Sequence, residues 1–308
     1  MIHRVWVLCF VLILILNITS CTRHLSKSGS LLIAVSIPPQ AWFVSEIAGG
    51  KAACLILVPP GQNPHNYEPT PRQIQALSSA DAWILSGSEF EIALRPKIES
   101  LFPDLLIISG TEGVKFRLLE DHDHDEDDHD HYVSHNALNN MFDHSSLIID
   151  RHTWLGLQPA LMLADHILKT LCLLDMENEE YYLLKYYETI PQINLAFDKI
   201  KKDLASLNGK SVFVYHPSFG YFFDEFGIIQ EAVETGGKEP TPRQLNELIE
   251  RITSEKPAAI FVQTQFPVNA ARTIADTVGT QVIELDPLAE DWLSNIYYMG
   301  EALKGLIR

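Results

Sequence analysis

Short apolar runs alternate with helix-like stretches along the first half of the chain. Trp42 to Ala48 has helical spacing of its apolar residues, and Thr70 followed by Pro71 is typical of a capped helix start. The runs that predict buried strands occupy residues 31–37, 54–58, 82–85 and 105–108. Strands that alternate with helices indicate an α/β lobe with a mainly parallel sheet.

The second half of the chain repeats this order. Strand-like runs occupy residues 212–215, 260–262 and 282–285. The segment 241–245 reads Thr-Pro-Arg-Gln-Leu and matches Thr-Pro-Arg-Gln-Ile at 70–74, and each precedes a strand that begins near an alanine, Ala82 or Ala259. A match at the same place in the strand order predicts two similar α/β lobes.

A stretch with few helix breakers separates the two lobes. We predict one long linker helix over residues 178–208, in which Leu195, Ile200 and Leu204 keep a helical spacing. Pro191 is expected to kink this helix or to mark its start. The N-terminal lobe is then residues 31–177, and the C-terminal lobe is residues 209–308.

The first twenty residues differ from the rest and predict a signal peptide, residues 1–20. A positive start at Arg4 precedes an apolar run over 5–16, which is too short to span a membrane comfortably. The run ends in Ile-Thr-Ser-Cys at 18–21, which resembles a bacterial lipobox, so we expect cleavage before Cys21 and a lipid on its thiol. An ordinary secretory signal is the alternative. Residues 21–30 are polar and predict a flexible tether, and no second transmembrane segment is expected.

The net charge limits the possible partners, and the cysteine content limits the possible disulfide bonds. A formal net charge of −17 disfavours nucleic acid as a partner, and it suits either attraction of cations or plain solubility. Beyond the signal peptide and Cys21, the remaining cysteines are Cys54, in a predicted strand, and Cys172, in a predicted helix, both among apolar residues. A disulfide between them and two buried free thiols remain alternatives.

Four side chains that can bind metal lie after strands or near helix starts: His65, His152, His216 and Asp286. Ligands bind outside the carboxyl ends of strands in open α/β sheets, so these residues predict a site between the lobes. Imidazole and carboxylate suit zinc, and also manganese or iron. The sequence has no His-Glu-x-x-His motif and no evident general base, which favours binding over catalysis. A zinc-dependent hydrolase that uses the same ligands and a bound water is the alternative from another class.

Four motifs in this order resemble the metal-binding solute-binding proteins of bacterial ABC importers for zinc, manganese or iron, of the zinc type. The motifs are Pro-His-Asn-Tyr-Glu-Pro (64–69), His-Thr-Trp-Leu (152–155), Tyr-His-Pro-Ser-Phe-Gly-Tyr (215–221) and Leu-Asp-Pro-Leu-Ala (285–289). The resemblance runs from about Leu31 to the C-terminus.

The resemblance implies two lobes joined by one long helix, an ion held between them by His65, His152, His216 and Asp286, and delivery of that ion to a membrane permease. It implies a monomer on the periplasmic or cell-surface side of a membrane. Members usually have proline where this chain has Arg151. In this family a histidine at the position of His216 favours zinc, whereas manganese binders often have a carboxylate there.

The segment 120–135 alternates histidine with acidic residues and predicts a mobile loop in the N-terminal lobe. Its weak metal ligands are His122, His124, His129 and His131. The resemblance agrees, because a loop rich in histidine and aspartate is common at this place in zinc-type members. We interpret it as a loop that collects or senses zinc, dispensable for tight binding, with a solvated acidic insert as the alternative.

Overall fold

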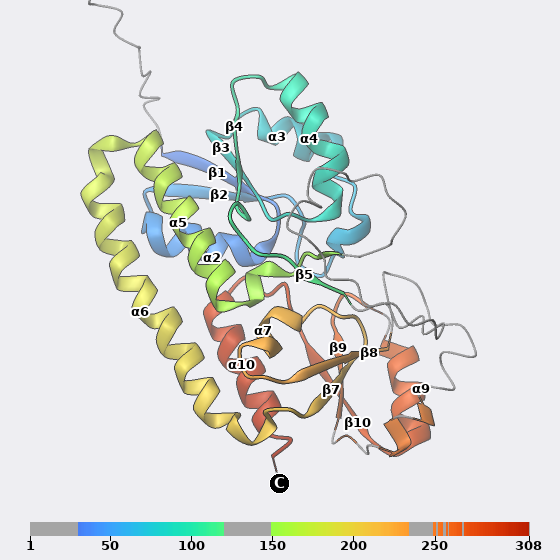
Figure 1. The fold of residues 1–308 in the computed structure, drawn as a ribbon. Helices are drawn as coiled ribbons and strands as arrows, with labels where there is room; N and C mark the ends of the chain where they lie inside the picture. The colour runs from blue at the N-terminus through green and yellow to red at the C-terminus, as the bar shows by residue number, and fades with distance from the viewer. Residues whose placement is uncertain are drawn as a thin grey trace, which may run out of the picture. The chain divides into compact units, whose positions relative to one another are not determined.

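Two parallel four-stranded sheets organise the part of the chain that the computed structural model describes (Figure 1). That part is residues 30–119, 149–233 and, with short gaps, 249–307. The predicted signal peptide, Cys21, the histidine-rich segment and the predicted helix start at 241–245 lie outside the described residues.

The N-terminal sheet contains the four predicted strands, all parallel, in the order β2-β1-β3-β4. The observed bounds are β1 Leu31–Val35, β2 Ala52–Ile56, β3 Ala82–Leu85 and β4 Leu106–Ser109. Every residue of β3 is buried, as expected for a central strand covered on both faces. The prediction of a mainly parallel α/β lobe is therefore confirmed for this half of the chain.

Helices α2 Pro38–Ala48, α3 Pro71–Leu77 and α4 Glu89–Leu101 connect these strands. The Thr70 hydroxyl accepts the backbone N–H of Gln73, so the predicted cap of α3 is confirmed. Helix α2 begins at Pro38, four residues before the predicted Trp42. Proline suits this first position because its missing N–H has no helical partner there.

The C-terminal sheet is also parallel and has the order β10-β9-β7-β8. Its strands are β7 Ser211–Val214, β8 Ile229–Ala232, β9 Ala259–Gln263 and β10 Gln281–Leu285. Three of them follow the predicted runs, whereas β8 was not predicted. Helices α7 Gly220–Asp224, α9 Val268–Val278 and α10 Trp292–Lys304 complete the described part of this lobe. A two-stranded antiparallel ladder joins β5 Arg117–Leu118 to β6 Ile149–Asp150.

One long helix, α6 Glu179–Asp203, runs from the N-terminal lobe to the C-terminal lobe, as predicted (Figure 1). Pro191 lies inside α6, so it does not mark the helix start. Ile200 and Leu204 are buried as the spacing suggested, but Leu195 is 64% exposed and is not on the buried face. Helix α10 approaches α6 closely at Gly300, where an added Cβ would lie 2.7 Å from Ile200 Cγ1.

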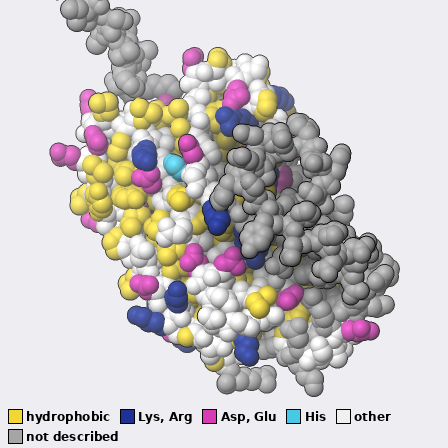
Figure 2. Space-filling view, viewed as in Figure 1, with side chains coloured by type: hydrophobic (Ala, Val, Ile, Leu, Met, Phe, Trp, Pro, Cys, Tyr) yellow, Lys and Arg dark blue, Asp and Glu magenta, His cyan; other side chains and the backbone are white. Residues whose placement is uncertain are grey.

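Helix α5 Leu157–Leu174 is long and apolar enough to cross a membrane by length and composition alone. One face of α5 is nevertheless buried, including Leu163, Ile167 and Leu171, and it packs against α2 and α6. Helix α5 is therefore part of the core of the N-terminal lobe. Figure 2 shows hydrophobic side chains gathered over the side where α5 and α6 lie, and exposed residues of these helices include Leu173 and Leu184.

The two cysteines outside the N-terminal segment are free thiols. Cys54 lies on β2 and Cys172 lies on α5, which are the element types that the sequence predicts. The alternative of a disulfide between them is therefore wrong. Cys54 is exposed rather than buried, and Cys172 is partly buried.

Tryptophans connect the lobes through buried hydrogen bonds. The Trp154 indole N–H donates to the carbonyl of Pro287 at 2.7 Å, and the Trp292 indole N–H donates to the carbonyl of Trp154 at 2.7 Å. Trp292 also packs its ring on Phe43 of α2, with centroids 4.7 Å apart. Apolar residues of both lobes consequently belong to one hydrophobic core.

Candidate metal centre

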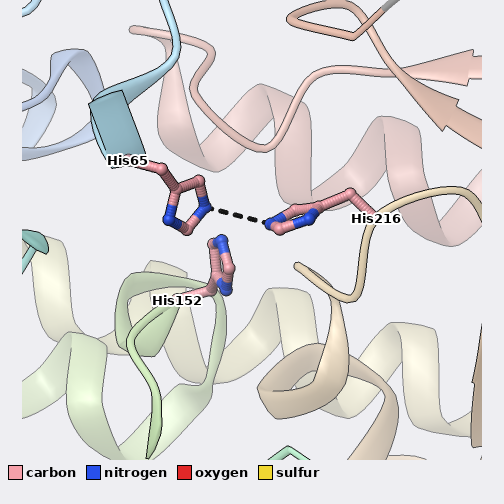
Figure 3. A group of neighbouring side chains, drawn as sticks. All are labelled: His65, His152 and His216. Carbon is pink, nitrogen blue, oxygen red and sulfur yellow. Dashed lines mark hydrogen bonds between the residues drawn. The ribbon is translucent and has the colours of Figure 1, made fainter. Parts of the chain in front are cut away.

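Three imidazoles from both lobes point toward one another at the boundary between the lobes (Figure 3). His65 lies in the 3₁₀ turn η1 Pro64–Asn66, His152 lies between β6 and the 3₁₀ turn η3 Thr153–Leu155, and His216 follows β7. Their ring centroids are 4.8, 5.2 and 5.3 Å apart. The sequence predicts all three as ligands, and the structure brings them together although they are far apart in the chain.

The spacing of the ring nitrogens suits a metal ion. One ligand nitrogen from each ring lies within 4.8 Å of the others, and His65 Nε2 is 3.0 Å from His216 Nε2. Tetrahedral zinc with nitrogen ligands at about 2.0–2.1 Å needs nitrogens about 3.3 Å apart, so small side-chain rotations suffice. A hydrogen bond between two imidazole nitrogens requires one proton between them, and a bound cation takes the place of that proton.

His152 is oriented by a fully buried carboxylate. Asp150 Oδ1 lies 2.8 Å from His152 Nδ1 and accepts the backbone N–H of His152 at 3.0 Å. Arg117 Nη1 is 3.5 Å from the other oxygen of Asp150 and provides the countercharge. Because Nδ1 faces the carboxylate, Nε2 of His152 is the nitrogen left for a metal ion.

His65 has the same arrangement with a different carboxylate. Glu89 Oε2 lies 3.0 Å from His65 Nδ1, and Glu89 Oε1 lies 3.4 Å from Arg151 Nε. Partial burial disfavours the charged carboxylate, but the hydrogen bond from His65 and the charge of Arg151 outweigh it, so the pKa of Glu89 is lowered. Glu89 is therefore ionised at neutral pH.

Two uncharged side chains, Gln263 and Phe266, contact His216. The Gln263 side chain accepts the backbone N–H of His216 at 3.1 Å, and its amide donates to the carbonyl of His216 and to the Ser218 hydroxyl. The Phe266 ring stacks on the imidazole with centroids 4.6 Å apart. Gln263 thus fixes the backbone of His216, while Phe266 fixes the plane of its ring.

Asp286, the fourth predicted ligand, follows β10 as expected but is not a member of the three-histidine group. Its Oδ1 accepts the Gln265 side-chain amide at 2.6 Å and the backbone N–H of Leu288 at 2.9 Å. Gln265 lines the same pocket as the three imidazoles, and its Oε1 is buried without a hydrogen-bond partner among the described residues. A buried oxygen with no donor is an atom that a bound cation would satisfy.

Sequence reasoning did not find Asp150, Glu89 and Gln265 as parts of the site. Asp150 could have been found because it lies two residues before His152, at the end of a short strand. Glu89 and Gln265 carry no such local signal, since they meet the histidines only through the fold. The predicted auxiliary ligands His122, His124, His129 and His131 lie outside the described residues.

Two α/β lobes joined by one helix, with an imidazole cluster between them, define a two-lobed binding protein. The sequence matches the family model "ZnuA: Zinc-uptake complex component A periplasmic" over residues 33–305, and the chain belongs to this family. The resemblance that the four motifs suggested is therefore confirmed.

Similar proteins agree with this assignment. The chain is 24% identical over 300 residues to a putative metal-binding protein of Chlamydia trachomatis, covering 97% of this chain and 99% of the relative. It is 26% identical to the high-affinity zinc uptake system protein ZnuA of Yersinia pestis over 84% of each chain. A crystal structure of ZnuA superposes with a TM-score of 0.79 at 28% identity, covering 90% of this chain and 99% of that one.

Proposed function

We propose that this protein binds a divalent transition-metal ion outside the cytoplasm, zinc first of all, and delivers it to an ABC-transporter permease for import. The observation that carries the proposal is the convergence of three imidazoles from two lobes. Membership of a family of substrate-binding proteins supports delivery rather than turnover, so the hydrolase alternative is set aside and the protein is not an enzyme.

Zinc is the proposed ion because the ligand set is rich in nitrogen. Imidazole suits zinc, whereas manganese prefers oxygen ligands. The name of the Yersinia pestis relative refers to zinc, and a Streptococcus pyogenes relative is named as an iron substrate-binding lipoprotein, so the family is not uniform. Manganese and iron remain the less supported cargo.

We propose His65, His152 and His216 as ligands and Asp286 as the fourth. For Asp286 to reach the ion, its carboxylate must leave the Gln265 amide, with which it is hydrogen bonded at 2.6 Å. Loading then exchanges one hydrogen bond for a metal–oxygen bond. Asp286→Ala should weaken zinc binding more than Gln265→Ala if Asp286 is the ligand.

We further propose that residues 1–20 are removed, that a lipid on Cys21 anchors a monomeric protein through the tether 21–30, and that the histidine-rich segment 120–135 collects zinc. These proposals rest on the sequence pattern and on relatives named as lipoproteins, such as AdcA of Streptococcus pneumoniae, of which the match covers 53%. The proposed domains are 31–177, 178–208 and 209–308.

Isothermal titration of the full chain with zinc, after removal of bound metal, tests the central proposal. Loss of a hydrogen bond to a metal ligand lowers metal affinity by up to about 100-fold. Loss of a ligand itself should cost more, so His65→Ala, His152→Ala and His216→Ala should each lower zinc affinity by more than this factor. His166→Ala, which alters a partly buried histidine on α5 outside the imidazole cluster, is the matched control and should leave the affinity unchanged. Equal affinities in all four variants would show that the ion binds elsewhere.

A further inference from the structure

Glu89 contacts the candidate site without belonging to the imidazole cluster. It is the first residue of α4, and its side chain is 40% exposed. Its Oε2 lies 3.0 Å from Nδ1 of His65, on the side of the ring away from the other imidazoles. The opposite ring nitrogen of His65, Nε2, is the one that meets His216 at 3.0 Å.

A carboxylate at Nδ1 determines which nitrogen is available to a metal ion. The charged oxygen accepts a hydrogen bond, so Nδ1 carries the proton and Nε2 presents its lone pair to the centre of the cluster. Such outer hydrogen bonds fix the ring and increase the basicity of the ligand nitrogen. Asp150 has the same relation to His152, at 2.8 Å.

Arg151 holds Glu89 in this orientation. Arg151 Nε is 3.4 Å from Glu89 Oε1, and Arg151 Nη1 donates to the carbonyl of Gly87 at 2.9 Å. The backbone N–H of Gly87 donates in turn to the buried carboxylate of Glu91 at 2.8 Å. The loop before α4 is thus a fixed support for the arginine.

We propose that Glu89 is a positioning residue for metal binding: it holds His65 as the Nδ1–H tautomer with Nε2 facing the ion, and Arg151 holds Glu89 in place. This inference rests on the proposed function, because it assigns a role to a residue that supports one of the proposed ligands. The inference also assigns a role to Arg151, because the Arg151 guanidinium contacts the Glu89 carboxylate and the Gly87 carbonyl.

The test compares zinc affinities of Glu89→Ala, Glu89→Gln and the matched control Glu99→Ala, measured by competition with a chromophoric chelator. Glu99 lies on the same helix and pairs only with Arg95 among the described residues, at 2.7 Å, so its removal changes net charge equally. Glu89→Ala should weaken zinc binding about 10- to 100-fold. Glu89→Gln keeps an acceptor oxygen and should recover most of this loss, and Glu99→Ala should change little.

A second readout separates positioning from loss of fold. Nitrogen-15 shifts of the His65 ring in the zinc-free protein should report the Nδ1–H tautomer in the wild type and in Glu89→Gln, and a mixture of tautomers in Glu89→Ala. An unchanged tautomer in Glu89→Ala overturns the proposal. Equal losses of affinity in Glu89→Ala and Glu89→Gln also overturn it, because charge or direct ligation would then be the cause.

A double-mutant cycle tests the role of Arg151. If Arg151 acts through Glu89, Arg151→Ala should change zinc affinity in the wild type but not in the Glu89→Ala background. Additive effects would contradict the proposed link. The titration of the wild type distinguishes failure of the proposed function from failure of this inference. If the wild type does not bind zinc, the proposed function is wrong. If the wild type binds zinc and the Glu89 variants bind it equally well, only the role of Glu89 is wrong.

Discussion

The two lobes share one sheet topology but build different halves of the site. Numbered along each lobe, the strands of both sheets lie in the order second, first, third, fourth. The proposed ligands do not follow that symmetry. His65 comes from the connection after the second strand of its lobe, whereas His216 directly follows the first strand of its own.

The surroundings of the imidazoles differ as well. His65 and His152 each have a carboxylate at Nδ1, and His216 is in contact with Gln263 and Phe266. Carboxylates thus orient the two proposed ligands of the N-terminal half, and Gln263 and Phe266 fix the backbone and the ring plane of the proposed ligand His216. A repeated scaffold thus does not imply a repeated site, because loops and not strands supply the ligands.

The largest effect is expected where the two halves meet, at Arg117. This side chain is 21% exposed, pairs with buried Asp150 in one lobe and donates to Asp224 Oδ2 on α7 in the other at 2.9 Å. Arg117→Ala leaves Asp150 without this countercharge and should lower the free energy of unfolding by about 2–3 kcal/mol, less than full loss of a buried pair. Chemical denaturation measures this. Asp224→Ala is the control, since Asp224 is 57% exposed and its loss should cost less than about 1 kcal/mol. Equal losses would mean that Asp150 does not need the arginine.

A smaller effect should distinguish the contact of Asp150 with His152 from the contact of Gln263 with His216. Asp150→Ala removes the acceptor at Nδ1 of His152, so zinc affinity should fall about 10- to 100-fold. Gln263→Leu breaks bonds to the His216 backbone and should lower the melting temperature while changing affinity less. Calorimetric titration and thermal unfolding measure the two quantities. The reverse ranking of affinities would remove the distinction between the halves.

The smallest effect is expected away from the site, where α6 meets α10. Asp203 Oδ2 lies 3.2 Å from the ammonium groups of Lys199 and Lys304, which lower the pKa of Asp203. Because the folded-state pKa lies below the unfolded value, this stabilisation is present above about pH 4 and is lost as the pH falls through the folded pKa. Asp203→Asn should lower the urea midpoint slightly at pH 7, and the difference from the wild type should narrow below pH 4. A constant difference would exclude the ion pairs as its cause.

Much of the fold could be predicted because its strands and caps are encoded locally. The apolar runs gave seven of the eight strands of the two sheets, and Thr70 with Pro71 gave the start of α3. Strand β8, Ile-Gln-Glu-Ala, was missed because two polar residues interrupt any apolar run. Helices α4, α7, α9 and α10 were not predicted, and α4 contains Pro96 in its interior.

The site could be predicted as far as residue position, but not as far as side-chain direction. The rule that ligands lie after strands located His216 and Asp286 at the same edge of the C-terminal sheet. It could not show that Gln265 holds Asp286 by a hydrogen bond. Likewise, Arg151 was noticed next to a ligand, but Glu89 lies 62 positions earlier and only the fold brings them together.

The tryptophan hydrogen bonds between the lobes bear on how often the protein opens. Separating the lobes at this point breaks two buried bonds, from Trp154 to Pro287 and from Trp292 to Trp154. Each of these bonds contributes about 0.5–1.5 kcal/mol net, so the two together lower the population of the open form by about 5- to 150-fold. If the proposed ion leaves through this opening, a permease that binds the open form should accelerate release by increasing the population of that form.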